Sequence, residues 1–206
     1  MSSTNRGAVR EERDFYPTPK DAFLPLIPFI RRHEDATVHV WDPAMGDGRL
    51  VKWMNEDRRG IVAHGSDLEG GIDFLADETT RECIVTNPPY SLGGLFVRHA
   101  VAKTYCARAT FEAFLLLRLN FLGSKCRKEW FQRHEPNALF VLSERPSFVT
   151  SLKCKACDSQ WTQAVEMERP KSCPKCGGPR PKATSSDSTE YAWFYWGARH
   201  RGIFHL

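Results

Sequence analysis

The sequence has no long apolar stretch, and runs such as residues 114–117 are short. A membrane-spanning helix needs about 18–20 apolar residues in a row, so no span is predicted. The first residues are polar and contain no apolar signal core, which leads us to expect a cytoplasmic protein without membrane contact. With 41% hydrophobic and 26% charged residues among 206, the chain is neither disordered nor collagen-like. Its length allows one full core plus a small module.

The sequence also has little net charge, since 29 Lys and Arg residues oppose 25 Asp and Glu residues. The excess is local: residues 151–182 contain seven basic and three acidic residues, and the rest of the chain is balanced. The same stretch holds four of the seven cysteines: Cys154, Cys157, Cys173 and Cys176. The other three are scattered among apolar residues and are predicted to be small buried hydrophobic residues: Cys83, Cys106 and Cys126.

The four clustered cysteines form two C-x2-C pairs separated by 15 residues. This spacing is typical of a zinc site with four thiolate ligands, because each tight turn directs two sulfurs at one ion. Two disulfides or a redox pair are the alternatives, and nothing marks the protein as secreted. We therefore predict a structural Zn²⁺ ion with no open coordination position. The metal would supply most of the folding energy of this zinc ribbon, because the segment has few large apolar residues.

Segments typical of strands and helices alternate along the chain. Strands are predicted at residues 37–41, 61–66, 83–86, 111–117, 138–142 and 191–196, and helices at 20–33, 49–57, 91–106 and 124–134. The two prolines in the first helix predict that it is irregular. The alternation predicts an α/β fold with a doubly wound, mostly parallel sheet. This domain would occupy residues 15–150 and 183–206, with a mobile arm at 1–14, the zinc ribbon inserted at 151–182 and a Ser/Thr-rich linker at 183–189.

Three groups follow predicted strands, at the edge of the sheet where α/β proteins bind ligands. The first is Asp42-Pro-Ala-Met-Gly-Asp-Gly48, whose glycines permit a tight turn. Asp67 ends the next strand, at a distance along the chain that suits a carboxylate binding ribose hydroxyls. Asp73 follows in a loop, where it can accept a hydrogen bond from an adenine amino group. The glycine turn can also be purely structural, Asp67 can also be a helix N-cap or a solvated acid, and Asp73 can also have no role in binding. The chain lacks G-x-G-x-x-G, which favours a nucleoside cofactor without phosphates over NAD.

The most informative motif is Asn87-Pro-Pro-Tyr90, which follows a predicted strand. Two consecutive prolines fix the backbone and remove two N–H donors. The Asn87 side chain and the Pro88 carbonyl then offer two acceptors, which suit an amino group with two hydrogens. Tyr90 adds a flat ring on which a base or an amide can stack. Such acceptors stabilise the positive charge that develops on an aromatic amine when it acts as a nucleophile.

On these motifs the sequence resembles the amino-methyltransferases that use S-adenosylmethionine, and it is most similar to the small adenine-N6 DNA methyltransferases of phages and prophages. The resemblance extends over residues 14–197 outside the zinc segment. The motifs that carry it are Phe15-Tyr-Pro-Thr-Pro19, Asp42-Pro-Ala-Met-Gly-Asp-Gly48, Asp67, Asp73-Phe-Leu75, Asn87-Pro-Pro-Tyr90, Arg145-Pro-Ser-Phe148 and Tyr191-Ala-Trp-Phe-Tyr-Trp196. It implies a Rossmann-like methyltransferase in a bacterium or a phage-infected host cell, active on nucleic acid, in a setting such as restriction-modification.

The resemblance also implies a role for each site residue. Tyr16, Pro17 and Thr18 would line the methionine end of the cofactor, Asp42 and Gly46 would hold its amino and carboxylate groups, and Asp67 and Asp73 would bind the ribose and the adenine. The full cofactor-binding set is Tyr16, Pro17, Thr18, Asp42, Pro43, Ala44, Gly46, Gly48, Asp67, Leu68, Asp73, Phe74 and Asn87. The catalytic set is Asn87, Pro88, Pro89 and Tyr90, with Tyr90 stacking on a flipped base and Phe148 on its opposite side. The substrate-binding set is Tyr90, Arg145, Phe148, Lys153, Lys155, Lys171 and Lys175.

Two features depart from the family pattern: Met45 stands where relatives have a small residue or cysteine, and no large target-recognition domain is present. Three alternatives to DNA methylation stay open at this point. One is an RNA adenine methyltransferase, another is a protein-glutamine methyltransferase, and the third is a zinc-ribbon adaptor for nucleic acid without activity. For the ribbon, the alternative to nucleic-acid contact is that it only folds and keeps the protein soluble. Since four thiolates around Zn²⁺ carry a net charge of −2, the assembled ribbon is nearer +2, and any attraction for nucleic acid depends on where its lysines lie.

Overall fold

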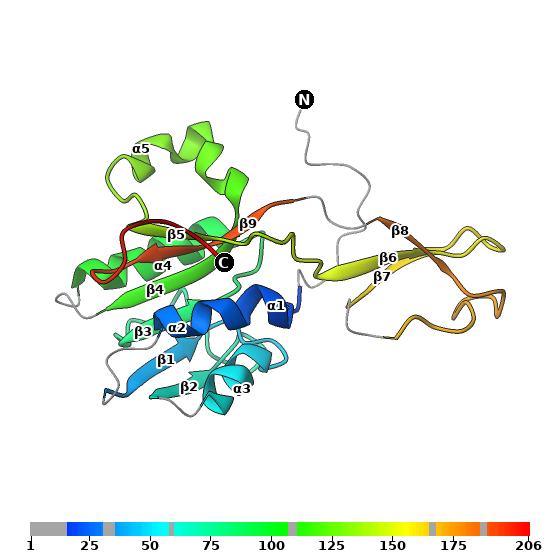
Figure 1. The fold of residues 1–206 in the computed structure, drawn as a ribbon, viewed down its shortest axis with the longest axis horizontal. Helices are drawn as coiled ribbons and strands as arrows, with labels where there is room; N and C mark the ends of the chain where they lie inside the picture. The colour runs from blue at the N-terminus through cyan, green and yellow to red at the C-terminus, as the bar shows by residue number, and fades with distance from the viewer. Residues whose placement is uncertain (1–15, 31–35, 58–59, 107–110, 165–167, 186–188) are drawn as a thin grey trace.

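The computed structural model describes residues 16–30, 36–57, 60–106, 111–164, 168–185 and 189–206. The expected arm at residues 1–14 lies outside the described residues. The chain forms a seven-stranded sheet and a separate three-stranded sheet. Figure 1 shows the larger sheet within a main body and the smaller one extending away from it. Among the described residues, no helix has the length and apolar character needed to cross a membrane.

The main sheet has the strand order β10-β5-β9-β4-β3-β1-β2. Its strands are β1 (Val38–Asp42), β2 (Ile61–Gly65), β3 (Cys83–Thr86), β4 (Glu112–Arg118), β5 (Ala138–Val141), β9 (Tyr191–Trp196) and β10 (Gly202–His205). All pairs are parallel except those of β9, which is antiparallel to β4 and to β5. The carboxyl ends of β1, β3, β4 and β5 therefore meet at one edge, together with the first residue of β9.

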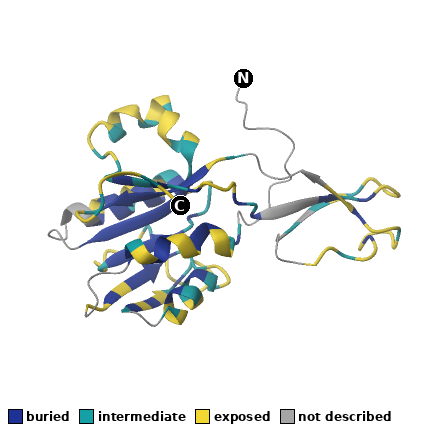
Figure 2. Ribbon diagram, in the orientation of Figure 1, coloured by how far each residue is buried: buried dark blue, intermediate teal, exposed yellow. Residues whose placement is uncertain are grey.

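Helices cover both faces of this sheet. They are α1 (Lys20–Phe23), η1 (Leu24–Leu26), α2 (Ile27–Ile30), α3 (Arg49–Glu56), α4 (Gly93–Cys106), η2 (Leu119–Gly123), η3 (Lys125–Arg127) and α5 (Lys128–Phe131). In β4, Phe114 and Leu116 pack on the side of α1 to α3, whereas Leu115 and Leu117 pack on the side of α4. This alternation leaves the central strands buried on both faces, as in parallel sheets with two helical layers (Figure 2).

The predicted α/β organisation is confirmed at the level of a mixed fold with a mostly parallel sheet. The irregular first helix is confirmed as well, since residues 20–30 form two short α-helices around a 3₁₀ turn. The helix predicted at 124–134 is wrong in length, because only η3 and the four-residue α5 form there. Residues 191–196 are not the last strand, because β10 follows. β10 is a short edge strand whose Ile203 is 66% exposed, so it has no hydrophobic pattern to reveal it.

The second sheet is antiparallel, with the order β7-β6-β8. Its strands are β6 (Val149–Lys153), β7 (Gln160–Ala164) and β8 (Lys182–Ser185). It extends slightly beyond the predicted insertion at 151–182, and β8 takes up the start of the predicted linker, of which residues 186–188 lie outside the described part. The insertion connects β5 to β9, which are neighbours in the main sheet. It therefore projects from the edge where the parallel strands end.

Candidate functional site

The chain changes direction across the main sheet at β1, since it continues to β2 on one side and returns to β3 on the other. Such a switch point leaves a crevice outside the carboxyl ends of the two strands, where ligands bind in α/β proteins. Here β1 ends at Asp42 and β3 ends at Thr86. Thr86 Oγ1 donates a hydrogen bond of 2.7 Å to Asp42 Oδ1, so the two strand ends are joined by their side chains.

A cavity of about 790 Å³ lies at this crevice, a size that suits a small-molecule ligand. Its lining comes from the N-terminal segment, from the loops after β1, β2 and β3, and from the first turns of α3 and α4. It includes Pro88, Pro89 and every residue of the expected cofactor-binding set except Gly48. Gly48 precedes α3 with a φ of 76°, a left-handed conformation that glycine adopts without strain. The structure thus brings together residues that are far apart in the sequence.

The lining also includes residues outside the expected set: Met45, Asp47, Arg49, Leu50, Glu69, Ile72, Leu75, Ser91, Leu92 and Phe96. Most of them follow expected residues in the same loops, and no spacing rule singles them out. The charge of the lining is mainly acidic, from Asp42, Asp47, Asp67, Glu69 and Asp73. Among the described lining residues Arg49 is the one cation, and its Nη2 lies 2.6 Å from Asp47 Oδ2. This lining favours a ligand with positive charge over one with phosphates.

Asp42 is the most deeply buried of these acids, with 1% of its surface exposed. It accepts hydrogen bonds from Thr86 Oγ1 and from the Ala44 N–H, at 2.7 and 3.2 Å. Burial raises the pKa of Asp42 to about 7, because removal of water disfavours the carboxylate. The hydrogen bonds act in the opposite direction, whereas the nearby Asp47 and Asp67 add to the rise. A cationic group placed beside Asp42 would restore its ionised form.

Asp67 and Asp73 each close a local turn. Asp67 Oδ1 accepts a hydrogen bond of 2.8 Å from the Gly70 N–H, and Asp73 Oδ1 accepts one of 2.9 Å from the Leu75 N–H. No helix begins at either residue, so Asp67 is not the helix cap that its alternative interpretation anticipated. Both carboxylates also line the cavity, and a carboxylate has a second acceptor oxygen. Closing a turn and binding a ligand are therefore compatible at these two positions.

Asn87 is held in one orientation by the segment that precedes α1. Its Nδ2 donates to the carbonyl of Tyr16 at 2.9 Å and to Thr18 Oγ1 at 3.0 Å. A carbonyl accepts and cannot donate, so the amide nitrogen has to face Tyr16. Asn87 Oδ1 is buried and has no hydrogen-bond partner among the described residues. A buried acceptor without a donor costs free energy, and such an atom at a cavity indicates a missing donor.

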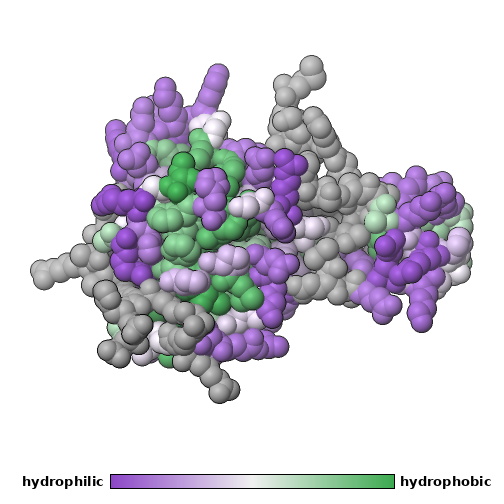
Figure 3. All heavy atoms as spheres, in the orientation of Figure 1, coloured by the Kyte–Doolittle hydropathy of each residue, from purple (hydrophilic) through white to green (hydrophobic). Residues whose placement is uncertain are grey.

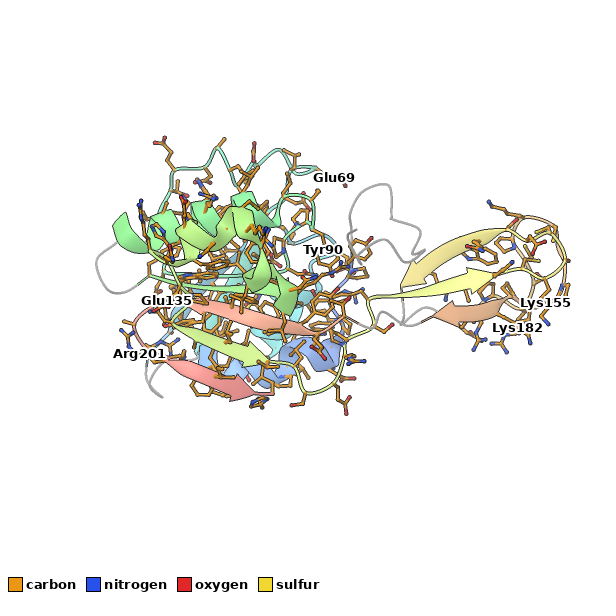
Figure 4. All side chains as sticks on the ribbon, turned by 90° about the horizontal axis from the view of Figure 1, so that it is seen from above. Glu69, Tyr90, Glu135, Lys155, Lys182 and Arg201 are labelled. Carbon is orange, nitrogen blue, oxygen red and sulfur yellow. The ribbon has the colours of Figure 1, made fainter. Side chains whose placement is uncertain are left out.

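Tyr90 follows the two prolines and lies beside the cavity rather than in its lining. Figure 4 shows it on the side of the main body that faces the second sheet. Its ring centroid is 4.7 Å from that of Tyr16, with the planes tilted by 34°. The guanidinium carbon of Arg118 lies 4.7 Å from the same centroid. The Tyr90 hydroxyl donates to the hydroxyl of Tyr191 at 3.1 Å.

Phe148 has a different orientation from the one that the resemblance implies. Phe148 is 2% exposed and stands edge-on to Tyr90, with the planes at 90° and the centroids 6.3 Å apart. It packs against Tyr191, so it does not face Tyr90 across a space for a base. Arg145 is exposed and forms an ion pair of 3.0 Å with Glu190.

The four clustered cysteines meet at the end of the second sheet, and their Sγ atoms all lie within 4.8 Å of one another. The Cys154–Cys176 and Cys157–Cys173 sulfurs are 3.7 and 3.8 Å apart. These distances are too long for disulfides, whose S–S bond is about 2.05 Å. They match the edge of about 3.8 Å of a tetrahedron of sulfurs, each about 2.3 Å from a central zinc ion. The cluster can therefore hold a metal ion, as its spacing predicts.

The remaining cysteines agree only in part with the sequence prediction, and nothing in the structure tests the predicted role of the ribbon lysines. Cys83 is buried, but the prediction for Cys126 is wrong, because Cys126 is exposed in η3. The side chain of Cys106 lies outside the described residues. Lys153 forms an ion pair of 3.0 Å with Asp158, and the other three predicted lysines are exposed: Lys155, Lys171 and Lys175. Figure 3 shows the outer part of the second sheet as a mostly hydrophilic surface.

In comparisons with known proteins, no family model and no curated protein matches this chain. Its chemistry therefore has to be inferred from the residues themselves. They provide an acid-rich cavity at a switch point, an oriented acceptor on Asn87 beside two prolines, and a tyrosine ring next to them. A basic module with a four-cysteine cluster projects from the same edge of the sheet.

Proposed function

We propose that this protein transfers a methyl group from S-adenosylmethionine to the N6 amine of adenine in nucleic acid, with DNA as the expected substrate. The observation that carries the proposal is the buried Asn87 Oδ1, which has no partner among the described residues. Because Tyr16 and Thr18 fix the amide nitrogen, this oxygen can only accept. An exocyclic amine is a donor that satisfies it.

The lining of the cavity fits S-adenosylmethionine in its charge and in its acceptors. Asp42 would hold the amino group, and Asp67 and Asp73 would bind the ribose and the adenine through their second carboxylate oxygens. Phosphate-bearing cofactors fit less well, since five acids and one paired arginine line the space. When bound, S-adenosylmethionine supplies an electrophilic methyl group.

The tetrad would activate the amine without a strong base. The Asn87 Oδ1 and the Pro88 carbonyl accept its two hydrogens, which favours a pyramidal nitrogen with a localised lone pair. These hydrogen bonds strengthen as the nitrogen becomes positive, and this stabilises the transition state. Removing a single preorganised group of this kind from an enzyme costs about 10²–10³ in rate.

The second sheet would contact the nucleic acid. We infer that Zn²⁺ is its metal and that the four thiolates leave no position for catalysis. Lys155, Lys171 and Lys175 are exposed and available to phosphates, which would give a salt-dependent affinity. An adenine within a duplex has to leave the stack before it reaches Asn87, at a cost of a few kcal/mol.

The experiment that tests the proposal uses methyl-labelled cofactor and separate pools of DNA, RNA and protein. We expect label in DNA, and in N6-methyladenosine after digestion to nucleosides. Label in RNA alone would mean that the substrate is RNA and not DNA. Label on glutamine would mean that the substrate is a protein and not a nucleic acid. No transfer to any pool, with the cofactor bound, would favour the inactive adaptor.

A further inference from the structure

We propose that Arg118 and Tyr191 are positioning residues that hold Tyr90 in the orientation needed for stacking. The inference rests on the proposed function, in which Tyr90 supports the target base. Neither residue belongs to the tetrad, and Arg118 lies in no motif of the sequence. It ends β4, the strand next to the one that leads into the tetrad.

The sheet register brings the two residues together. Arg118, the last residue of β4, is opposite Tyr191, the first residue of the antiparallel β9. Arg118 Nε donates a hydrogen bond of 3.1 Å to the Tyr191 hydroxyl. The same hydroxyl accepts from the Tyr90 hydroxyl, also at 3.1 Å. The hydroxyl oxygen of Tyr191 therefore links the guanidinium of Arg118 to the hydroxyl of Tyr90.

Tyr191 is a rigid anchor for this connection. It is fully buried, and Phe148 packs on it with ring centroids 4.9 Å apart. Arg118 adds a second constraint, because its guanidinium carbon lies 4.7 Å from the centroid of Tyr90. A guanidinium at this distance attracts the electron-rich face of a tyrosine ring. Tyr90 is thus held at its hydroxyl by Tyr191 and at its ring by Arg118.

With Arg118 in place, the Tyr90 ring packs against one planar group, since the ring of Tyr16 lies 4.7 Å from it with a tilt of 34°. A target base that stacks on Tyr90 in the same way would take the place of the Tyr16 ring. If Arg118 is removed, Tyr90 can turn about its side-chain bonds, and the base loses a preorganised surface. The loss should appear in the binding of nucleic acid and not in the binding of cofactor.

The test compares Arg118→Leu and Arg118→Lys with a matched control, Arg98→Leu. Arg98 also lies over an aromatic ring, 5.4 Å from that of Trp130, but on α4 rather than beside the tetrad. In Arg118→Leu we expect the KM for nucleic acid to rise roughly tenfold to a hundredfold, the range expected when one base–aromatic stack is removed. Arg118→Lys keeps the charge but not the Nε donor, so its KM should lie in between. Cofactor affinity should not change in either variant, and Arg98→Leu should match wild type.

A double-mutant cycle with Tyr90→Ala separates positioning from direct contact. If Arg118 acts through Tyr90, Arg118→Leu should change the KM by less than about twofold once Tyr90 is alanine. An equally large effect in both backgrounds, or no effect in wild type, overturns the inference. Tyr191→Phe keeps the packing but removes the shared hydroxyl, so it should raise the KM for nucleic acid. This variant tests the inference even if Arg118→Leu folds poorly. An unchanged KM in Tyr191→Phe overturns the inference. Failure of wild type to methylate nucleic acid instead refutes the proposed function, and the inference with it.

Discussion

The side chain of Thr86 donates a hydrogen bond of 2.7 Å to the carboxylate of Asp42, and so joins the ends of β3 and β1. The pair lies at the switch point of the sheet and beneath the cavity. Asp42 is almost fully buried there, and burial raises its pKa to about 7. The residue expected to hold the cofactor's amino group therefore titrates near neutral pH.

The first prediction concerns this titration. Only the ionised carboxylate binds an ammonium group strongly, so cofactor affinity should increase by about tenfold between about pH 6 and about pH 8. The stability of the free protein should change in the opposite direction. Between its ordinary pKa of 3.8 and about 7, Asp42 keeps its proton only in the folded state, so its contribution to stability falls as pH rises. Calorimetric titration between about pH 6 and about pH 8 measures the affinity for cofactor. Denaturant unfolding between about pH 4 and about pH 7 measures the free energy of unfolding.

Asp42→Asn is the control for both trends. The amide cannot ionise, so the variant should bind cofactor weakly at every pH, and its stability should lose this pH dependence. A wild-type affinity that stays flat across the range would contradict the assignment of Asp42 to the amino group.

The second prediction concerns Asn87. Asn87→Ala removes the oriented acceptor, and methyl transfer should fall at least about a hundredfold. Single-turnover transfer of labelled methyl groups measures this effect, with cofactor binding recorded in parallel. Asn55→Ala is a matched control, because Asn55 bonds the backbone of Ala63 at 2.8 and 2.9 Å on α3, away from the tetrad. Asn55→Ala should lower the stability of the protein and leave methyl transfer intact. If Asn87→Ala transferred methyl groups as fast as Asn55→Ala, the tetrad would be excluded from the mechanism.

The third prediction concerns the metal. The purified protein should contain about one zinc ion per chain, measured by elemental analysis, because four sulfurs form one tetrahedral site. Cys173→Ser should lower the zinc content and unfold the second sheet, since the metal supplies most of its folding energy. Cys126→Ser, at an exposed cysteine outside the cluster, should keep the full zinc content. Zinc-free protein with an intact second sheet would show that the fold does not depend on the metal.

The fourth prediction concerns the charge of the ribbon. Replacing Lys153, Lys155, Lys171 and Lys175 by alanine should weaken DNA binding and flatten its salt dependence, by about 0.9 in slope for each phosphate that is no longer neutralised. A control variant removes the same charge from exposed positions of the main body: Lys52, Lys125, Lys128 and Arg133. Binding measured over a range of salt concentrations distinguishes the two. Equal reductions in both variants would mean that the attraction is not specific to the ribbon.

The fifth prediction concerns an ion pair at the start of β4 whose carboxylate is buried and whose arginine is partly exposed. Arg199 binds both carboxylate oxygens of Glu112, at 2.6 to 2.9 Å, and Glu112 is only 3% exposed. Tyr195 donates to the same carboxylate. Arg199→Leu leaves this charge buried without its cation and should destabilise the protein by about 3 kcal/mol in denaturant unfolding. Arg145→Ala breaks an exposed pair and should cost less than about 1 kcal/mol.

The sequence predicts most of the cavity because its residues follow strands that end at one edge. Once β1 and β3 are expected to be parallel neighbours, Asp42 and Asn87 have to lie close together. The metal cluster is predictable for a similar reason, since a C-x2-C pair fixes two sulfurs by local geometry alone.

The surroundings of Tyr90 are not predictable in this way. Arg118 reaches Tyr191 across 73 residues of chain, and only the register of β4 against β9 brings them together. The edge-on orientation of Phe148 depends on the packing of Tyr191, which no local pattern specifies. The acidic character of the lining arises from several loops at once, so it becomes visible only when the loops meet.

The attachment of the second sheet has a consequence for chain entropy. The Leu142 N–H donates a hydrogen bond of 3.1 Å to the Tyr191 carbonyl, so residues 143–190 leave and rejoin the main sheet side by side. β5 and β9 are antiparallel neighbours, so the whole second sheet lies within the connection of a β-hairpin. The entropic cost of closing such a connection grows slowly with its length. Modules of very different size can therefore occupy this position without altering the strand order. Under the proposed function, the part of the chain that would contact nucleic acid could change there while the residues of the cavity stay the same.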